Sequence, residues 1–508
     1  MTQTSLPLPP AATPPATAAS GLPFGLSPAR AALLLAALAT LLHVAYAGAL
    51  ALTPQEAYYW QWSRHLDLSY FDHPPLAAWT IRLFTAAFGD SERSVRLAAA
   101  LHTSIFCLFF FLAGRRLFGP RVALLALAAM LVVPFFSIGQ TIITPDGPMV
   151  AGWVAALYFT IRALDEERGA WLLAAGVAVG LSMLGKYTGA LLAPQILAVL
   201  LLDARGRRLL ATPWPWLAIL VAAAAFSPVV VWNARHGWAS VAYQTTRRGA
   251  EMTHLDPMLT ARFVGLQSLG VSPILWVVLV VAALAAARRW REPSMRTCAL
   301  FSVPLLVLLF AVSPLHWVKL NWGAPAYPTA LLAAAALYAE DPPRRRTLAL
   351  ASLGLAAFAS LYMHLVPVVP ALPFSARDET SSGWRELAAR VDSELGRIPG
   401  RPFVVGCYYK TASELAFYLP GRPETFSGNV FGDPGLQYDY WPGAEALLGR
   451  EGIVVVDARD GGYCRRRGEV CEPLQALEPL TVRRGQGVVT TFGLYRCRYP
   501  ASLLGLAR

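Results

Sequence analysis

Ionisable and aromatic side chains gather in a few short segments of a chain that is otherwise strongly apolar. The first segment, TPQEAYYWQWSRHLDLSYFDHPPL at 53–76, combines acids, a histidine, tyrosines and tryptophans. Later segments read TPD at 144–146, GKY at 185–187, WNARHGW at 232–238 and HWVKLNW at 316–322. Cations neutralise phosphate, carboxylates accept protons or hold sugar hydroxyls, and aromatic faces stack on sugar rings. These residue types therefore suit a substrate with phosphate, sugar and lipid parts.

The elements that position these segments are membrane-spanning helices. The chain has 508 residues, of which 56% are hydrophobic and 15% charged, and apolar runs of about 16 to 24 residues recur through it. This composition predicts a polytopic α-helical membrane protein. Eleven spans are expected, at about 31–51, 97–114, 122–143, 147–162, 170–184, 187–202, 213–233, 268–287, 298–314, 323–340 and 347–369.

Arginine placement predicts the orientation of these spans. Basic residues concentrate at every second connection, as in the arginines near 115–121, 205–208, 288–296 and 344–346. Short cytoplasmic loops retain Lys and Arg, so these ends are expected inside, and the polar segments outside. The N-terminus is then cytoplasmic, in a plasma (inner) membrane protein. The net charge of +12 is explained as a topology signal, and nucleic acid is not an expected partner.

Three regions are predicted. Residues 1–28, rich in Pro, Ala and Thr, resemble a disordered cytoplasmic tail. Residues 29–370 form the transmembrane domain, with a first outer loop at 52–96. Residues 371–508 form a small periplasmic or extracellular α/β domain, with an amphipathic helix at 384–398 and buried strands within 402–409, 452–458 and 487–497.

Four of the six cysteines lie in this C-terminal region, which is placed in an oxidising compartment. Cys464 and Cys471 are expected to close a short loop by a disulfide. Zinc is less favoured, because the region has no histidine and no CxxC pair.

The order of the motifs resembles a known family. EAYYW, YFDHPP, PD, GKYTG, SPVVVWN followed by HGW, and VKLNW followed by APAY, between about residues 50 and 330, are similar to the family 39 glycosyltransferases of GT-C type. These include protein O-mannosyltransferases and lipid A aminoarabinose transferases. The resemblance implies transfer of a sugar from a polyprenyl-phosphate donor to a lipid, cell-envelope glycan or protein acceptor on the outer face. We expect inversion at the anomeric carbon.

The resemblance also suggests site residues. The family usually has Asp-Glu before the first aromatics, but here the first position is Gln55, which leaves Glu56 and Asp146 as the catalytic carboxylates. Asp72 and His73 match an acid–base pair that resembles a metal or phosphate contact. The other expected substrate- or phosphate-binding residues are Tyr58, Tyr59, Tyr70, Lys186, Arg235, Lys319 and Asn321.

Each residue also has a structural alternative. Glu56 could cap a loop helix, and Asp146 could stabilise a helix N-terminus. The tyrosines could belong to an interfacial aromatic belt, and His73 could anchor a turn. No cofactor is assigned, and a divalent metal stays an open alternative because acids, His73 and Tyr70 cluster without a known metal-ligand spacing.

Two other functions fit parts of the pattern. Eleven spans would allow a transporter of a sugar-lipid, although transporters usually carry ionisable sites near the bilayer midplane, where these spans are nearly free of charge. A non-catalytic sugar-lipid binding protein is suggested by Gln55 alone.

Overall fold

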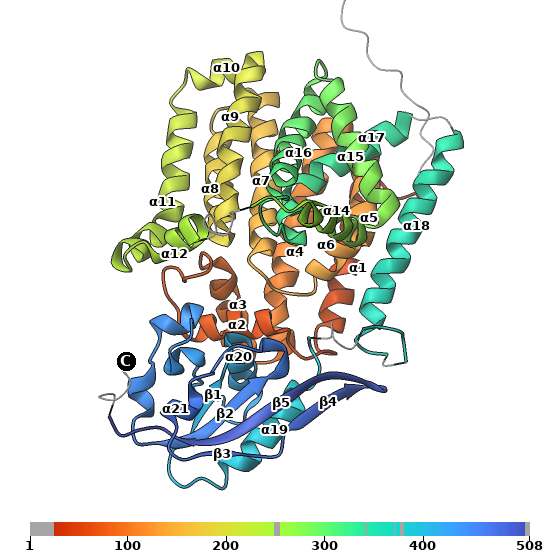
Figure 1. Ribbon diagram of the computed structural model, residues 1–508. Helices are drawn as coiled ribbons and strands as arrows, with labels where there is room; N and C mark the ends of the chain where they lie inside the picture. Colours follow the sequence, from red (N-terminus) through yellow and green to blue (C-terminus); the bar gives the residue numbers. More distant parts are fainter. Residues whose placement is uncertain (1–24, 248–253, 341–342, 370, 376–379, 503–508) are drawn as a thin grey trace, which may run out of the picture.

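A bundle of helices with a mixed β-sheet at one end makes up the protein in the computed structural model (Figure 1). The structure describes residues 25–247, 254–340, 343–369, 371–375 and 380–502. The expected disordered tail lies, up to residue 24, outside the described residues.

The α-helices of the bundle and its outer loops, in chain order, are α1 (Pro28–Tyr46), α2 (Pro54–Arg64), α3 (Leu76–Phe88), α4 (Glu92–Phe118), α5 (Pro120–Val132), α6 (Pro134–Gly139), α7 (Asp146–Asp165), α8 (Trp171–Gly185), α9 (Leu192–Leu202), α10 (Ala204–Leu210), α11 (Trp214–Arg235), α12 (Ala239–Ala242), α14 (Pro257–Val271), α15 (Pro273–Arg288), α16 (Pro293–Val312), α17 (Tyr327–Glu340) and α18 (Pro343–Leu365). Shorter turns of helix are η2 (Tyr187–Leu191), η3 (Tyr243–Arg247) and η4 (Leu320–Ala326).

The expectation of eleven spans is not confirmed. Among the described residues, six helices are long and apolar enough to cross a membrane, or up to eight if each of two bent helix pairs is one span. One reason is that proline divides apolar runs: Pro134 lacks the N–H that would continue α5, so the run at 122–143 becomes α5 and α6. Another is length, because the 15 residues of α8 span only about 22 Å.

Helix α7 is the best-buried span and packs against α4 and α8. Gly152 allows the close approach of α7 and α8, since a Cβ atom there would lie 2.8 Å from the Ala178 carbonyl oxygen. This contact brings the start of α7 beside the end of α8.

Two short helices, α2 and α3, lie between the bundle and the sheet (Figure 1). Thr53 and Glu56 form a capping box at the start of α2, with Pro54 in its first turn. The helix buries an aromatic face, including Tyr58, Trp60 and Trp62, against the C-terminal part of the chain.

The sheet is built from β1 (Phe403–Gly406), β2 (Glu451–Asp457), β3 (Leu474–Ala476), β4 (Leu480–Arg484) and β5 (Gly487–Arg498). Its order is β1-β2-β5-β3, with β4 also paired to β5; β1 and β2 are parallel, and the other pairs are antiparallel. Apolar residues of α19 (Trp384–Leu395) and α20 (Tyr409–Tyr418) pack on strand residues such as Val404, Ile453 and Phe492.

The expected helix at 384–398 and the three expected strands are therefore present. The division of the chain at about residue 370 stays a prediction.

The predicted disulfide is wrong in its pairing. Cys407 is bonded to Cys464, and Cys471 to Cys497. The short sequence separation of Cys464 and Cys471 favoured joining them, but each lies beside a cysteine that the sheet brings close: Cys407 directly follows β1, and Cys497 lies in β5.

Candidate functional site

A carboxylate, an ammonium and an amide meet where α7 begins. Lys186 Nζ donates to Asp146 Oδ1 at 2.7 Å, and Asn321 Nδ2 donates to Asp146 Oδ2 at 2.7 Å. Asp146 opens α7, Lys186 caps the C-terminus of α8, and Asn321 lies in η4. The sequence predicted all three residues, and tertiary packing brings them together.

This cluster is mostly shielded from solvent, with side-chain exposures of 14% for Asp146 and 10% for Lys186. The amide dipoles at the start of α7 also favour a negative charge there. Each carboxylate oxygen has a second lone-pair direction. Asp146 can therefore accept a further hydrogen bond from a substrate hydroxyl while its two partners fix its orientation.

A second carboxylate, Asp72, lies nearby. Tyr58 donates its hydroxyl proton to Asp72 Oδ1 at 3.3 Å and accepts from the backbone N–H of Gln437 at 2.9 Å. The pKa of the Tyr59 phenol is raised well above its usual value by burial and then by the negative charges of Asp72 and Asp146. The charges of both carboxylates therefore act on the Tyr59 phenol.

Glu56 lies in a different environment from Asp146. It is fully buried, and Arg96 holds it through Nε to Oε1 at 2.9 Å and Nη2 to Oε2 at 2.8 Å. The backbone N–H groups of Thr53 and Ile143 also donate to it, at 2.9 and 3.3 Å. Glu56 therefore has the alternative role that the sequence allowed, the cap of a loop helix, and it joins α2 to α4.

Tyr70 is likewise engaged within the first loop. Its hydroxyl donates to the carbonyl oxygens of Trp62 and His65, at 2.9 and 3.2 Å, and its ring stacks on Trp62 at 4.4 Å. His73 is half-buried, and its carbonyl oxygen accepts from the Tyr70 N–H at 3.3 Å. These contacts shape the turn that carries Asp72.

The remaining expected cations are exposed. Arg235 ends α11, and Lys319 directly precedes η4. In the WNARHGW segment, Trp232 Nε1 donates to Asp67 Oδ2 at 2.8 Å, which ties α11 to the first loop. The segment therefore has an evident structural contact in addition to its exposed arginine.

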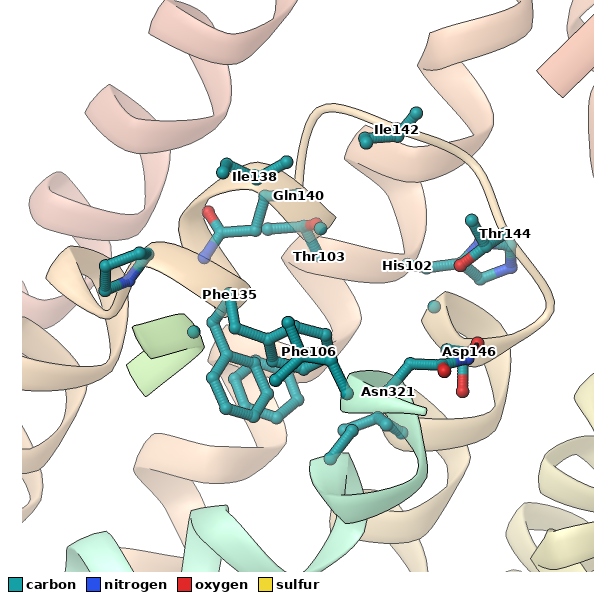
Figure 2. Close-up of a pocket in the computed structure, with 18 of the residues that line it drawn as sticks. His102, Thr103, Phe106, Phe135, Ile138, Gln140, Ile142, Thr144, Asp146 and Asn321 are labelled. Atoms are coloured by element: carbon teal, nitrogen blue, oxygen red, sulfur yellow. Dashed lines mark hydrogen bonds between the residues drawn. The ribbon is translucent and has the colours of Figure 1, made fainter. Parts of the chain in front are cut away.

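An apolar cavity of about 500 Å³ opens beside Asp146 and Asn321 (Figure 2). Residues of α4, α6, α7, α14, η4 and α18 line it. Figure 2 shows Asp146 and Asn321 on one side of the lining, Phe106 and Phe135 in the middle, and Gln140 on the other side. The apolar lining and the Asp146 carboxylate therefore border the same space.

Among the described residues, no group of three or more His, Cys, Asp or Glu side chains could hold a metal ion. The sequence did not point to Arg96, Gln437 or Gln140, and His102 was interpreted from it as a packed polar residue. Arg96 could have been found as a charge at the edge of the expected span at 97–114, but Gln437 contacts the first loop only through folding, at a separation of more than 360 residues.

Comparisons with known proteins point to glycosyltransferases. A family model described as dolichyl-phosphate-mannose-protein mannosyltransferase matches residues 72–232. The chain is 26% identical to the lipid A galacturonosyltransferase RgtD of Rhizobium johnstonii over 396 residues, 75% of this chain and 82% of that protein.

It is also 31% identical to an undecaprenyl phosphate-alpha-4-amino-4-deoxy-L-arabinose arabinosyl transferase of Pseudomonas paraeruginosa over 346 residues, 62% of this chain and 60% of that relative. The structure is similar to that of ArnT from Cupriavidus metallidurans bound to undecaprenyl phosphate, with a TM-score of 0.65, 18% identity, and coverage of 91% of this chain and 97% of that one. The chain therefore has the fold of a GT-C-type membrane protein, and its predicted resemblance to the family 39-like glycosyltransferases of GT-C type is confirmed.

Proposed function

We propose that the protein is a glycosyltransferase that moves a sugar from a polyprenyl-phosphate-linked donor to an acceptor hydroxyl on the outer face of the plasma membrane. The observation that carries this proposal is the Asp146–Lys186–Asn321 cluster at the side of an apolar cavity. Support comes from relatives named as lipid A galacturonosyltransferase and undecaprenyl-phosphate aminoarabinose transferase.

Asp146 acts as the general base in this proposal. The acceptor oxygen attacks the anomeric carbon as its proton passes to Asp146. The bond between that carbon and the phosphate oxygen breaks, and polyprenyl phosphate leaves with the electron pair. In-line attack inverts the anomeric carbon. Lys186 and Asn321 are positioning residues, because they fix the carboxylate through its two oxygens.

The departing phosphate requires cations. His73, Arg235 and Lys319 are the proposed contacts, with Asp72, Tyr58 and Tyr59 shaping the sugar site and Tyr70 supporting the turn beside it. Glu56 is proposed as a structural residue, because Arg96 and backbone N–H groups occupy its carboxylate.

The arginine-rich ends support the proposed sidedness. Arg116 pairs with Asp165 and Glu166 at 3.3 and 2.6 Å, and Arg205 lies 3.7 Å from Asp165. Asp165 ends the helix that Asp146 begins, so the two are about 28 Å apart. Since arginine-rich short loops favour the cytoplasm, Asp146 would lie on the outer side.

Substituting the two ends of α7 tests this function. In membranes containing the protein, a labelled polyprenyl-phosphate sugar and an acceptor, Asp146→Asn is expected to lower release of polyprenyl phosphate by about 100- to 10,000-fold, the range of general base catalysis. Asp165→Asn is the matched control and should retain turnover within about threefold.

Loss of less than about threefold at Asp146 would contradict its role as base. If neither the variant nor the wild type releases polyprenyl phosphate with any donor tried, the proposed function is contradicted. Flux of intact donor into proteoliposomes without transfer would favour the transporter instead.

A further inference from the structure

Gln140 places an amide with no protein partner inside the apolar cavity. It caps the C-terminus of α6 and is only 6% exposed, yet neither its Nε2 nor its Oε1 has a hydrogen-bond partner. Buried polar groups are nearly always satisfied, so an amide left without partners is expected to gain them from a ligand. An amide needs a ligand atom that accepts and one that donates.

Other polar groups line the same cavity. His102 is 5% exposed and also lines the cavity. Thr103 and Thr144 add hydroxyl groups to the lining. Figure 2 shows Gln140 and Asp146 toward opposite sides of the view, with Phe106 and Phe135 lower in it. The cavity thus has polar groups at several points of an apolar lining.

The carrier lipid of the proposed donor does not match this lining. Beyond its phosphate a polyprenyl chain is hydrocarbon, which offers nothing to an amide. Its phosphate needs cations, but within the described part of the chain no lysine or arginine lines the cavity, and the Asp146 carboxylate does. The ammonium of Lys186 is already engaged by the Asp146 carboxylate at 2.7 Å, so this pair offers no net positive charge to a phosphate.

We propose that the cavity receives an acyl chain of the acceptor, and that Gln140 hydrogen-bonds a hydroxyl or amide group on that chain. This inference rests on the proposed function, in which Asp146 deprotonates the acceptor hydroxyl. An acceptor lipid bound along the cavity would have its sugar end at Asp146 and its chain at Gln140. The cavity volume lies within the range of ligand pockets.

Two acceptors test the proposal on the wild-type protein: a glucosamine lipid with β-hydroxymyristoyl chains and the same lipid with myristoyl chains. One neutral hydrogen bond corresponds to about a tenfold effect at most. We therefore expect a KM about five- to tenfold lower for the hydroxylated lipid, with kcat within about twofold. Equal KM values for the two lipids would overturn the proposal.

Gln140→Leu should abolish this preference by raising the KM for the hydroxylated lipid and leaving the KM for the polyprenyl donor unchanged. The matched control is Gln195→Leu, because Gln195 in α9 is also buried, at 8% exposure, and has an unpartnered Oε1, but lies outside the cavity lining. The control should retain the preference. A higher KM for the donor alone in Gln140→Leu would assign the cavity to the polyprenyl chain and overturn the proposal.

Binding separates this proposal from the proposed function. Calorimetric titration of purified protein with each lipid measures binding and requires no turnover. Tighter binding of the hydroxylated lipid, lost in Gln140→Leu, would support the acyl-chain site even if no sugar donor is used. Equal binding with active transfer would overturn the acyl-chain site and leave the enzyme assignment standing.

Discussion

Replacing Glu56 with glutamine separates a structural carboxylate from a catalytic one. Arg96 is 4% exposed and donates to both Glu56 oxygens and to the carbonyl oxygens of Ala47, Leu50 and Ala51. Glu56→Gln removes the negative charge and leaves the guanidinium buried without its counter-ion. Loss of one partner of a buried ion pair costs about 3–5 kcal/mol. We therefore expect a clear loss of stability in Glu56→Gln.

The control is the same substitution in an exposed pair. Glu424 lies 3.1 Å from Arg64 and has a side-chain exposure of 54%, so Glu424→Gln should cost at most about 1 kcal/mol. Thermal unfolding in detergent, followed by tryptophan fluorescence, compares the two variants with the wild type. Turnover is measured well below the unfolding temperature, where folded Glu56→Gln should work within about threefold of the wild type.

One combination of results would refute this reasoning. If Glu56→Gln unfolds at the wild-type temperature but turnover falls about 100-fold or more, Glu56 acts on the substrate and not on Arg96. Loss of stability with nearly normal turnover would assign the chemistry to Asp146 alone.

Three further predictions concern the C-terminal part and the start of α2. Burial, followed by the charge of Glu56, raises the pKa of Glu414 well above 4.5. The contribution of Glu414 to stability is therefore complete below about pH 4.5 and declines as pH rises toward the pKa in the folded state. Glu414→Gln should unfold at a higher temperature than the wild type near pH 8, and a difference in unfolding temperature that stays the same from pH 5 to pH 8 would contradict this. A digest without reductant should yield Cys471 linked to Cys497, and Cys471→Ser should lower stability by about 2–4 kcal/mol, whereas recovery of free Cys471 would contradict the pairing. Gln55 is exposed, so Gln55→Asp should change turnover by less than about threefold; a gain of about 100-fold would restore the family's aspartate as the base.

The cluster of Asp146, Lys186 and Asn321 shows how far prediction from the sequence reaches. Lys186 was recognisable because a lysine between two short apolar runs is costly near a bilayer without a partner, and Asp146 because it matches an acidic position of the family that the sequence resembles. Their separation of 40 residues gave no means of pairing them. The pairing depends on the close contact of α7 and α8 at Gly152.

Glu56 shows the opposite case. Its motif predicted catalysis by resemblance, and the local pattern also predicted a helix cap. The contact with Arg96 favours the structural role. Arg96 lies 40 residues away and reaches Glu56 through the packing of α4.

The membrane class, the GT-C-type resemblance, the helix and strands of the C-terminal region, and the residue types of the candidate site could all be predicted from the amino-acid sequence. These follow from composition, periodicity and motif order, which are local properties of the chain. The number of long spans, the disulfide pairing, the partners of Glu56 and the apolar cavity with Gln140 became evident only from the folded structure. Those features depend on which distant segments come into contact, because a carboxylate's role is fixed by the partners that packing places around it.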